Sequence, residues 1–287
     1  MQTRTLGRTG HRSSVAILGG AAFAGSTPEK TAGSFASALS AGVNHLDVAP
    51  RYGRAEELLG PCVAEARDSL FVACKTQRKD PAGVRAQLEE SLRLLHCEYF
   101  DLYQLHAVTD LEELDARARA VEVLLAARDE GLCRFVGVTG HNLTAPQAHA
   151  EALRRYDLDT VMFPVNPRLW ADSSYRASAE ELLEAAAGRN VGVMAIKAAA
   201  ARPWGDRPHT SDTWYEPFVA EDALDRNIRF VLSVPGVHAF CTPGDLELLP
   251  AVFRAAGAAS PMEEPELTRA MAATREEPHI FPMPTLA

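Results

Sequence analysis

The stretch His45-Leu-Asp47-Val-Ala-Pro-Arg-Tyr52-Gly53 puts two polar groups where a strand gives way to a loop. Residues 43–48 are predicted to form a buried strand, and the proline and glycine that follow indicate a tight turn. Asp47 then lies at the end of the strand, and Tyr52 lies on the loop. Each has an ordinary structural explanation when taken alone, a turn cap for the acid and packing for the phenol.

Two later strands add a lysine and a histidine at the same position. Phe71-Val-Ala-Cys-Lys75 ends in Lys75, and Leu102-Tyr-Gln-Leu-His106 ends in His106. A solvated strand end and a histidine at the edge of the core are the alternative explanations. Independent packing roles would not need to converge on successive strand ends. We therefore treat Asp47, Tyr52, Lys75 and His106 as one candidate catalytic site.

The rest of the chain alternates apolar strands with helices. Strands are predicted at 15–18, 43–48, 70–74, 100–105, 135–139, 160–164, 191–196 and 238–241, with helices at 28–41, 55–66, 83–95, 114–130, 146–155, 178–187, 221–232 and 245–256. Strict alternation implies parallel strands, and eight units predict a (β/α)8 TIM barrel of the α/β class. A doubly wound sheet is the alternative, but no GxGxxG pattern follows the first strand.

We expect one domain over residues 1–287. A short β-hairpin is predicted around residues 3–10, where two glycines flank an Arg-Thr pair, and a last helix over 263–273 precedes a Pro-rich tail. Arg4, Arg8 and Arg12 precede a Gly-rich apolar run that superficially resembles a signal peptide. That run fits a first strand and a glycine turn better. We therefore expect a cytoplasmic protein.

Composition narrows the class of partner. The 287 residues are 47% hydrophobic and 23% charged, as in a globular enzyme, and the formal net charge is -9. No basic cluster is present, so nucleic acid is an unfavourable partner, and no apolar stretch approaches the ~20 residues that span a bilayer. The five cysteines form no CxxC pair, and no metal site is predicted from them. The sequence predicts no oligomeric state.

The four candidate side chains together can deliver a proton to a carbonyl oxygen. A free phenol has a pKa of about 10, and an ammonium about 4 Å away lowers it unless burial opposes the effect. Asp47 would keep Lys75 charged and oriented, and His106 would donate to or orient the carbonyl. No side chain supplies a hydride, so the reaction requires a nicotinamide cofactor.

At this point the chain clearly resembles the aldo-keto reductase family. The matching phrases are Leu6-Gly-Arg-Thr-Gly10, Gly42-Val-Asn-His-Leu-Asp47-Val-Ala-Pro-Arg-Tyr52-Gly53, Glu56-Glu-Leu-Leu-Gly60, Lys75-Thr76, Ser91-Leu92, Phe100-Asp-Leu-Tyr-Gln-Leu-His106 and Gly137-Val-Thr-Gly-His141. The resemblance implies a (β/α)8 barrel that binds NADP(H) without a Rossmann fold and interconverts a small carbonyl compound and its alcohol. It implies that Asp47, Tyr52, Lys75 and His106 are the catalytic residues, with Tyr52 as the acid.

The cofactor side departs from the family pattern. The family usually has Ser-Asn after strand five, Gln after strand six, an aromatic residue after strand seven and a basic phosphate loop near strand eight. The candidate cofactor-binding residues that stand in this chain are Gly20, Thr139, His141, Asn142, Asn166, Lys197, Thr242 and Gly244. Asp245 would repel a 2′-phosphate, so NADP is the expected cofactor and NAD is an alternative.

The substrate is less visible from the sequence. The long connection from Ala198 to Pro217 carries Trp204, Trp214 and Tyr215, and we expect it to lie over the barrel mouth. Arg51, Arg168 and Arg202 could favour an acidic substrate, but scattered surface arginines more often simply extend into water. The sequence does not identify the substrate.

Two other functions remain open. The altered cofactor side favours a regulatory barrel that binds the cofactor with little turnover. A different barrel enzyme could use Lys75 as a Schiff-base nucleophile, or His45, Asp47 and His106 as metal ligands. His45 and Asp47 share a strand face because they are two residues apart.

Overall fold

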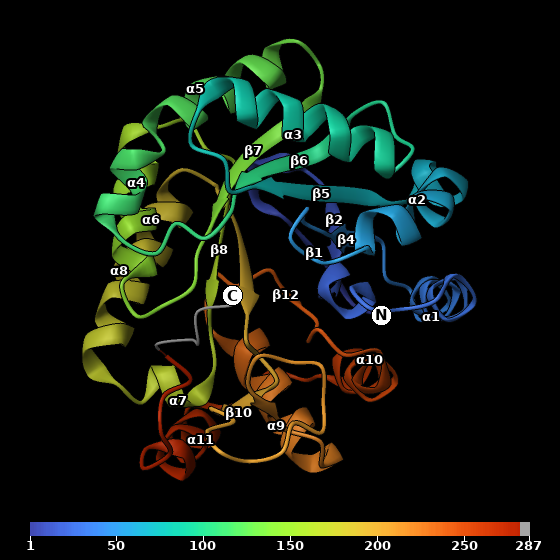
Figure 1. Ribbon diagram of the computed structural model, residues 1–287. Coiled ribbons are helices and arrows are strands. Elements are labelled where there is room, and N and C mark those ends of the chain that lie inside the picture. The colour runs from blue at the N-terminus through green and yellow to red at the C-terminus, as the bar shows by residue number, and fades with distance from the viewer. Residues whose placement is uncertain (282–287) are drawn as a thin grey trace.

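Eight parallel strands close into a barrel in the computed structural model, which describes residues 1–281 (Figure 1). The strand order around the barrel is β12-β3-β4-β5-β6-β7-β8-β9. The strands are β3 (Ala16–Gly19), β4 (His45–Asp47), β5 (Phe71–Thr76), β6 (Phe100–Leu105), β7 (Cys133–Thr139), β8 (Thr160–Pro164), β9 (Gly192–Ile196) and β12 (Ala239–Cys241). This is the predicted (β/α)8 architecture.

Helices surround the barrel and cover its strands (Figure 1). They are α1 (Pro28–Ser40), α2 (Ala55–Ala66), α3 (Pro81–Leu94), α4 (Leu111–Ala116), α5 (Ala118–Asp129), α6 (Ala145–Arg155), α7 (Pro167–Trp170), α8 (Ser173–Gly188), α9 (Glu221–Ser233), α10 (Leu249–Ala258) and α11 (Glu264–Thr274). Short 3-10 turns lie at Gly7–Thr9, Gly20–Phe23, Arg67–Ser69 and Leu246–Leu248. The main core forms between the helices and the outer face of the strands.

The predicted N-terminal hairpin is present and closes the bottom of the barrel. Strands β1 (Thr3–Thr5) and β2 (Arg12–Ser14) pair antiparallel. Leu6, in the turn between them, is fully buried and joins the cluster of apolar side chains inside the barrel. Gly7 has a positive φ of 50°, and a Cβ there would lie 2.4 Å from the backbone nitrogen of Gly192. Only glycine lets the hairpin approach the barrel this closely.

Three helix-to-strand junctions share a left-handed residue, as their similar sequences predict. Gly42, Gly131 and Asn190 have φ values of 83°, 81° and 51°. Such a residue ends a helix and turns the chain back toward the next strand. At the other end of α1, the Thr27 hydroxyl accepts a hydrogen bond from the Lys30 amide at 3.2 Å. Thr27 is therefore the helix cap.

Three details differ from the prediction. The helix expected over 114–130 is two helices, α4 and α5, which meet at Arg117. The short helix α7 precedes α8, and the connection from Ala198 to Pro217 contains a small antiparallel pair, β10 (Ala200–Arg202) with β11 (Glu216–Pro217). The end of the predicted Pro-rich tail, residues 282–287, lies outside the described residues.

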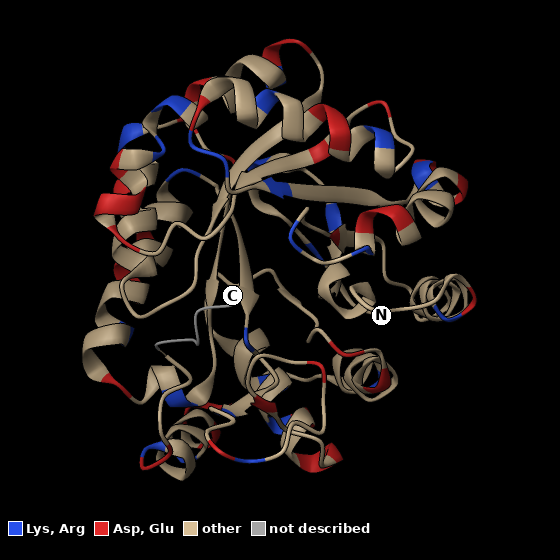
Figure 2. Ribbon diagram, in the orientation of Figure 1, with Lys and Arg blue, Asp and Glu red and all other residues tan. Residues whose placement is uncertain are grey.

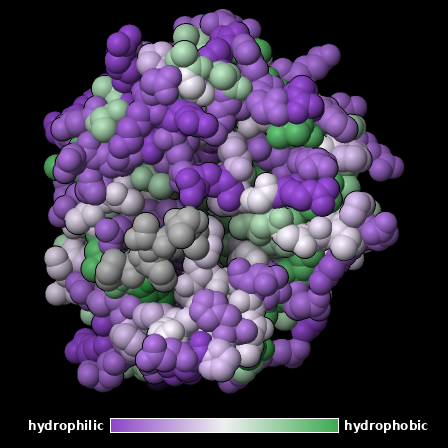
Figure 3. Space-filling view, in the orientation of Figure 1, coloured by the Kyte–Doolittle hydropathy of each residue, from purple (hydrophilic) through white to green (hydrophobic). Residues whose placement is uncertain are grey.

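Charged side chains of both signs lie mainly on the outer helices and loops, while most strand residues are uncharged (Figure 2). One face of the molecule is largely hydrophilic, with small separated apolar patches (Figure 3). Across residues 1–281, no helix combines the length and apolar character that a membrane span requires.

Candidate active site

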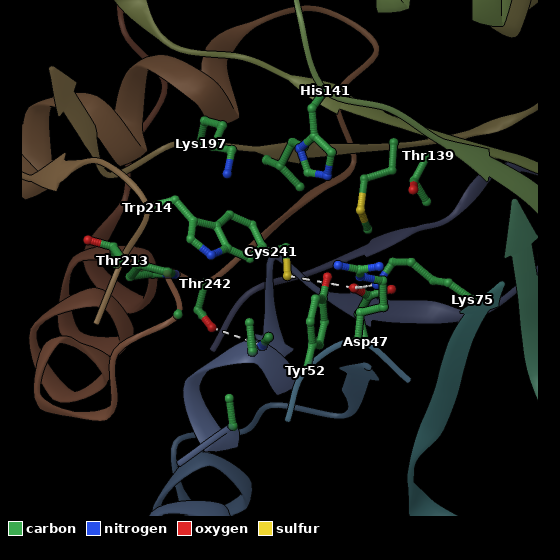
Figure 4. A pocket seen from close by; sticks show the side chains of 18 of the residues that line it. Asp47, Tyr52, Lys75, Thr139, His141, Lys197, Thr213, Trp214, Cys241 and Thr242 are labelled. Atoms are coloured by element: carbon green, nitrogen blue, oxygen red, sulfur yellow. Dashed lines mark hydrogen bonds and ion pairs between the residues drawn. The ribbon is translucent and has the colours of Figure 1, made fainter. Parts of the chain in front are cut away.

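The four predicted catalytic residues meet in one cavity at the carboxyl ends of the strands (Figure 4). Asp47 is the last residue of β4, Lys75 lies near the end of β5, and His106 directly follows β6. Tyr52 reaches the same cavity from the loop after β4. Convergence follows from the parallel strands, which all end at the same rim of the barrel.

Asp47 and Lys75 form a buried ion pair. The Lys75 ammonium donates a hydrogen bond to Asp47 Oδ2 and lies 3.3 Å from the carbonyl of Val48. Gln104 Nε2 donates to Asp47 Oδ1 at 3.1 Å. Burial opposes the lysine charge, but Asp47 and the Tyr52 oxygen outweigh it and raise the pKa of Lys75. The lysine is therefore a fixed cation, which disfavours its use as a Schiff-base nucleophile.

Tyr52 is held beside this ion pair by a tight turn. Its amide donates to the carbonyl of Ala49 at 3.0 Å, and Gly53 follows with a φ of 51°. A Cβ at Gly53 would lie 2.5 Å from the carbonyl oxygen of Ala24, so glycine is required. The Lys75 nitrogen lies 5.2 Å from the centre of the Tyr52 ring.

Burial outweighs the effect of Lys75 on the pKa of Tyr52. Burial raises this pKa to about 12, and the attraction of Lys75 for the phenolate only partly offsets that effect. Asp47 contributes to the rise. Tyr52 therefore carries its proton at neutral pH and can donate it as an acid.

His106 completes the wall opposite the phenol. The two rings meet edge to face with centroids 5.8 Å apart, and the His106 amide donates to the carbonyl of Thr76 at 2.8 Å. Burial, with a smaller contribution from Lys75, holds the pKa of His106 well below its usual value. The imidazole is therefore neutral and can donate one hydrogen bond without bringing a second charge to the site.

Two predicted cofactor-binding residues offer unpartnered polar atoms. Thr139 Oγ1, at the end of β7, and His141 Nδ1 are buried and have no hydrogen-bond partner within residues 1–281. Both residues line the cavity. Buried polar atoms without partners are costly unless a ligand satisfies them. The amide group of a nicotinamide, which both donates and accepts, fits this pair.

Gly140 explains why the usual asparagine is absent after strand five. A Cβ there would lie 2.1 Å from the carbonyl oxygen of Val108 and 2.6 Å from Nε2 of His149. His149 comes from α6 and is fully buried. This ring occupies the space that a side chain at position 140 would need.

Lys197 is a second buried lysine in the cavity, at the end of β9. Its nitrogen lies 4.6 Å from the ring centre of Trp214 and 4.9 Å from that of Tyr215. Within the described part of the chain its ammonium makes no hydrogen bond or ion pair closer than 4.0 Å. Burial lowers the pKa of Lys197 to about 7. An anionic ligand would supply the missing partner.

Thr242 and Gly244 also line the cavity, after β12. The Thr242 hydroxyl accepts a hydrogen bond from the amide of Gly19 at 2.9 Å, which joins the last strand to the first. Lys197, Thr242 and Gly244 thus lie after the seventh and eighth strands of the barrel, where barrels of this type commonly bind phosphate.

The other three predicted cofactor-binding residues do not line the cavity. A Cβ at Gly20 would lie 2.8 Å from the Val48 side chain, so this glycine serves strand packing. Asn142 adopts a φ of 91°, and its side-chain oxygen accepts a hydrogen bond from the amide of Leu143. Asn166 caps α7 by accepting from the amide of Leu169 at 2.9 Å.

Sequence reasoning missed two groups beside Asp47. Gln104 could have been found, because it lies two residues before His106 and so shares its strand face. Cys241 lines the cavity with its sulfur 3.9 Å from Asp47 Oδ2, and burial raises its pKa to about 12. No role for this cysteine was predicted from the sequence. Trp214 and Tyr215 lie over the mouth, as predicted.

The metal-ligand alternative is not supported by the geometry. His45 Nδ1 lies 2.9 Å from the Ser13 hydroxyl, and its ring packs against Phe71 away from the residues that line the cavity. Within residues 1–281 no three His, Cys, Asp or Glu side chains gather closely enough to hold a metal ion. His45, Asp47 and His106 therefore do not form one site.

Parts of the sequence are similar to curated proteins. The chain is 30% identical to the aldo-keto reductase YhdN of Bacillus subtilis over 140 residues, which are 44% of this chain and 41% of that protein. It is 33% identical to the methylglyoxal reductase DkgA of Salmonella typhimurium over 104 residues, 35% and 37% of the two chains. The chain thus spans less than half the length of these curated relatives.

A solved structure matches nearly the whole fold. The aldo-keto reductase AKR11C1 of Bacillus halodurans superposes with a TM-score of 0.75 at 19% identity, covering 97% of this chain and 98% of that one. At this identity the match concerns the fold alone. The sequence profile of the Aldo/keto reductase family matches residues 16–204, which is more than half of the chain. With this match and the barrel described above, the chain belongs to the aldo/keto reductase family of oxidoreductases.

Proposed function

We propose that this protein is an NAD(P)H-dependent reductase that converts a small aldehyde or ketone to its alcohol, or catalyses the reverse reaction. The observation that carries the proposal is the convergence of Asp47, Tyr52, Lys75 and His106 on one buried cavity. Membership of the family supports an oxidoreductase. The cavity supplies the acid and the hydrogen-bond donor that carbonyl reduction needs.

Tyr52 gives its hydroxyl proton to the oxygen of the substrate carbonyl. Its pKa of about 12 keeps the proton on the phenol until a strong base develops nearby. As the carbonyl becomes an alkoxide, the oxygen becomes such a base. Lys75 then stabilises the phenolate that remains, and Asp47 keeps Lys75 charged and oriented. Proton donation of this kind contributes about 10²–10⁴-fold to a rate.

His106 orients the carbonyl without competing for the proton. Its low pKa keeps the imidazole neutral, so its ring N–H donates a hydrogen bond to the substrate oxygen. Two donors, Tyr52 and His106, whose ring centroids lie 5.8 Å apart, then face one oxygen. They fix its position and stabilise the charge that develops on it.

The remaining walls of the cavity suit the cofactor. The nicotinamide ring supplies the hydride when the dinucleotide is bound. Thr139 Oγ1 and His141 Nδ1 would bind its amide group, since both atoms are unpartnered in the described structure. Lys197, Thr242 and Gly244 would hold the phosphates at the far side. These residues replace those that the family usually has.

The test is an assay of purified protein with methylglyoxal and with benzaldehyde, using NADH and NADPH in turn. Methylglyoxal is chosen because one relative is named for its reduction. Oxidation of either cofactor that depends on the carbonyl compound is the expected result. Cofactor binding without turnover toward these or other small carbonyl compounds would favour the regulatory alternative. Inactivation by borohydride with an aldehyde, in the absence of cofactor, would favour a Schiff-base enzyme.

A further inference from the structure

The reaction cavity is too small for a whole dinucleotide. Its volume is about 180 Å³, below the roughly 300–1,000 Å³ of typical ligand sites. The cofactor must therefore extend beyond it. A second cavity adjoins the first and shares Asp212, Thr213 and Trp214 with it. This neighbour offers a continuous path out of the barrel mouth.

The second cavity is acidic. Three carboxylates line it, from Asp212, Asp245 and Glu247. Lys30 is the one lysine or arginine among the described residues that line it, and its ammonium is already paired with Glu247 at 2.7 Å. Apart from Lys30, His209 is the one basic side chain among the described residues that line this cavity.

Asp245 takes up the donors that would otherwise hold an anion there. Its Oδ2 accepts hydrogen bonds from the Ser211 hydroxyl and from the Asp212 amide at 3.1 Å, and its Oδ1 accepts from the Glu247 amide at 2.8 Å. The carboxylate is 7% exposed. Burial opposes its charge, but these hydrogen bonds lower the pKa of Asp245, so it is ionised at neutral pH. In barrels of this type a phosphate commonly binds at this place, after strands seven and eight.

We propose that the adenosine end of the cofactor lies in the second cavity and that Asp245 makes the site select NADH over NADPH. This inference rests on the proposed function. A ribose 2′-hydroxyl is a donor and can use the acceptor position that remains on Asp245 Oδ1. A 2′-phosphate brings about two negative charges toward a fixed carboxylate, and the described lining offers no lysine or arginine besides the paired Lys30.

The first measurement is calorimetric titration of wild-type protein with NADH and with NADPH. The dissociation constant for NADH is expected to be at least about tenfold lower, which corresponds to about 1.4 kcal/mol. Because screening weakens repulsion between charges, the ratio should narrow when salt rises from about 0.05 M to about 0.5 M. Equal binding, or tighter binding of NADPH, overturns the inference while leaving the reductase proposal intact.

The second measurement uses Asp245→Asn, which removes the charge and keeps an acceptor for the Ser211 and Asp212 donors. The NADH to NADPH preference is expected to fall below about threefold, mainly through tighter NADPH binding. Glu90→Gln is the matched control, because Glu90 is an exposed acid on α3 that pairs only with Arg93 within the described chain. It should leave the ratio unchanged.

The outcomes separate the inference from the function on which it rests. A preference that persists in Asp245→Asn overturns the role of the carboxylate. If Asp245→Asn fails to fold, the salt dependence of the wild-type ratio of NADH to NADPH dissociation constants tests the inference. A ratio that does not change with salt contradicts repulsion between Asp245 and the 2′-phosphate. Binding of neither cofactor removes the proposed function and the inference together.

Discussion

Lys197 lowers the stability of the protein in a pH-dependent way. Its pKa is about 7 in the folded chain and about 10.4 when unfolded, so the unfolded chain holds more protons between these values. The free energy of unfolding therefore rises with pH across this window. The destabilisation caused by burying the charged Lys197 side chain is fully present below pH 7. Replacing Lys197 with Met should raise the free energy of unfolding by up to about 4 kcal/mol at pH 7, and by less than about 1 at pH 10.

Urea unfolding at both pH values measures the effect. Lys79→Met is the control, because Lys79 is exposed and pairs with Glu113 on the surface. Its free energy of unfolding should stay within about 0.5 kcal/mol of wild type. Equal free energies of unfolding for wild type and Lys197→Met at pH 7 would contradict the claim that the Lys197 ammonium is buried and unpaired.

The same lysine should make cofactor binding depend on pH. Only its charged form attracts the phosphates, and that form declines as the pH rises above 7. The dissociation constant for NADH is therefore expected to increase as the pH rises from 6.5 to 9. In Lys197→Met this dependence should disappear and binding should be weaker at low pH. A steep dependence that survives the substitution would assign the titration to another group.

Individual residues were predictable where their position at a strand end and their chemical type both indicate a catalytic role. Asp47, Lys75 and His106 stand at matched strand ends, and the cavity contains all three. The pKa of Tyr52 was not predictable, because it depends on how completely the closed barrel mouth excludes water. Asn166 looked like a ligand residue, but Asn is equally suited to cap a helix, and α7 begins directly after it.

At the scale of elements, the end of β7 depends on the glycine at position 140. Gly140→Ala would force a methyl group against the Val108 carbonyl and the His149 ring. We expect a loss of about 1–3 kcal/mol in the free energy of unfolding and weaker cofactor binding through displaced neighbours. Gly188→Ala, where nothing lies within 4 Å of the new Cβ, is the control. Denaturant unfolding and NADH titration compare the two variants. Equal free energies of unfolding and equal dissociation constants for NADH would contradict the close packing around Gly140.

Most elements follow from periodicity and from turn residues. The stripe of Val84, Leu88, Leu92 and Leu95 predicts α3, and all four side chains are buried. The pair β10 and β11 was not predictable, because strands of three and two residues carry no periodic signal. The break between α4 and α5 at Arg117 was also hidden, since no Pro or Gly marks it.

The whole molecule should become more stable when its cofactor binds. A ligand at 100 times its dissociation constant adds about 2.7 kcal/mol to the free energy of unfolding. For a chain of this size we expect the Tm to rise by several degrees with NADH. ATP at the same concentration, with phosphates but no nicotinamide, should give a much smaller shift. No shift with either nicotinamide cofactor, tested by scanning fluorimetry, would contradict binding across the barrel mouth.

Charge distribution on the scale of the molecule bears on the choice between NADP and NAD. The family resemblance implies NADP(H), whereas the second cavity is lined by three carboxylates and one paired lysine. Sequence alone could identify Asp245 as unfavourable. It could not show that Asp212, from the long connection, lies against Asp245, because that contact joins residues 33 apart across an irregular loop.

The most direct test of the account compares Tyr52→Phe with wild type for cofactor binding and for turnover of a carbonyl compound that wild type reduces. The substitution removes one oxygen and keeps the ring against His106. The account predicts that the dissociation constant for NADH stays within about twofold, while kcat falls by at least about 10²-fold. Unchanged kcat in Tyr52→Phe would contradict the assignment of Tyr52 as the proton donor.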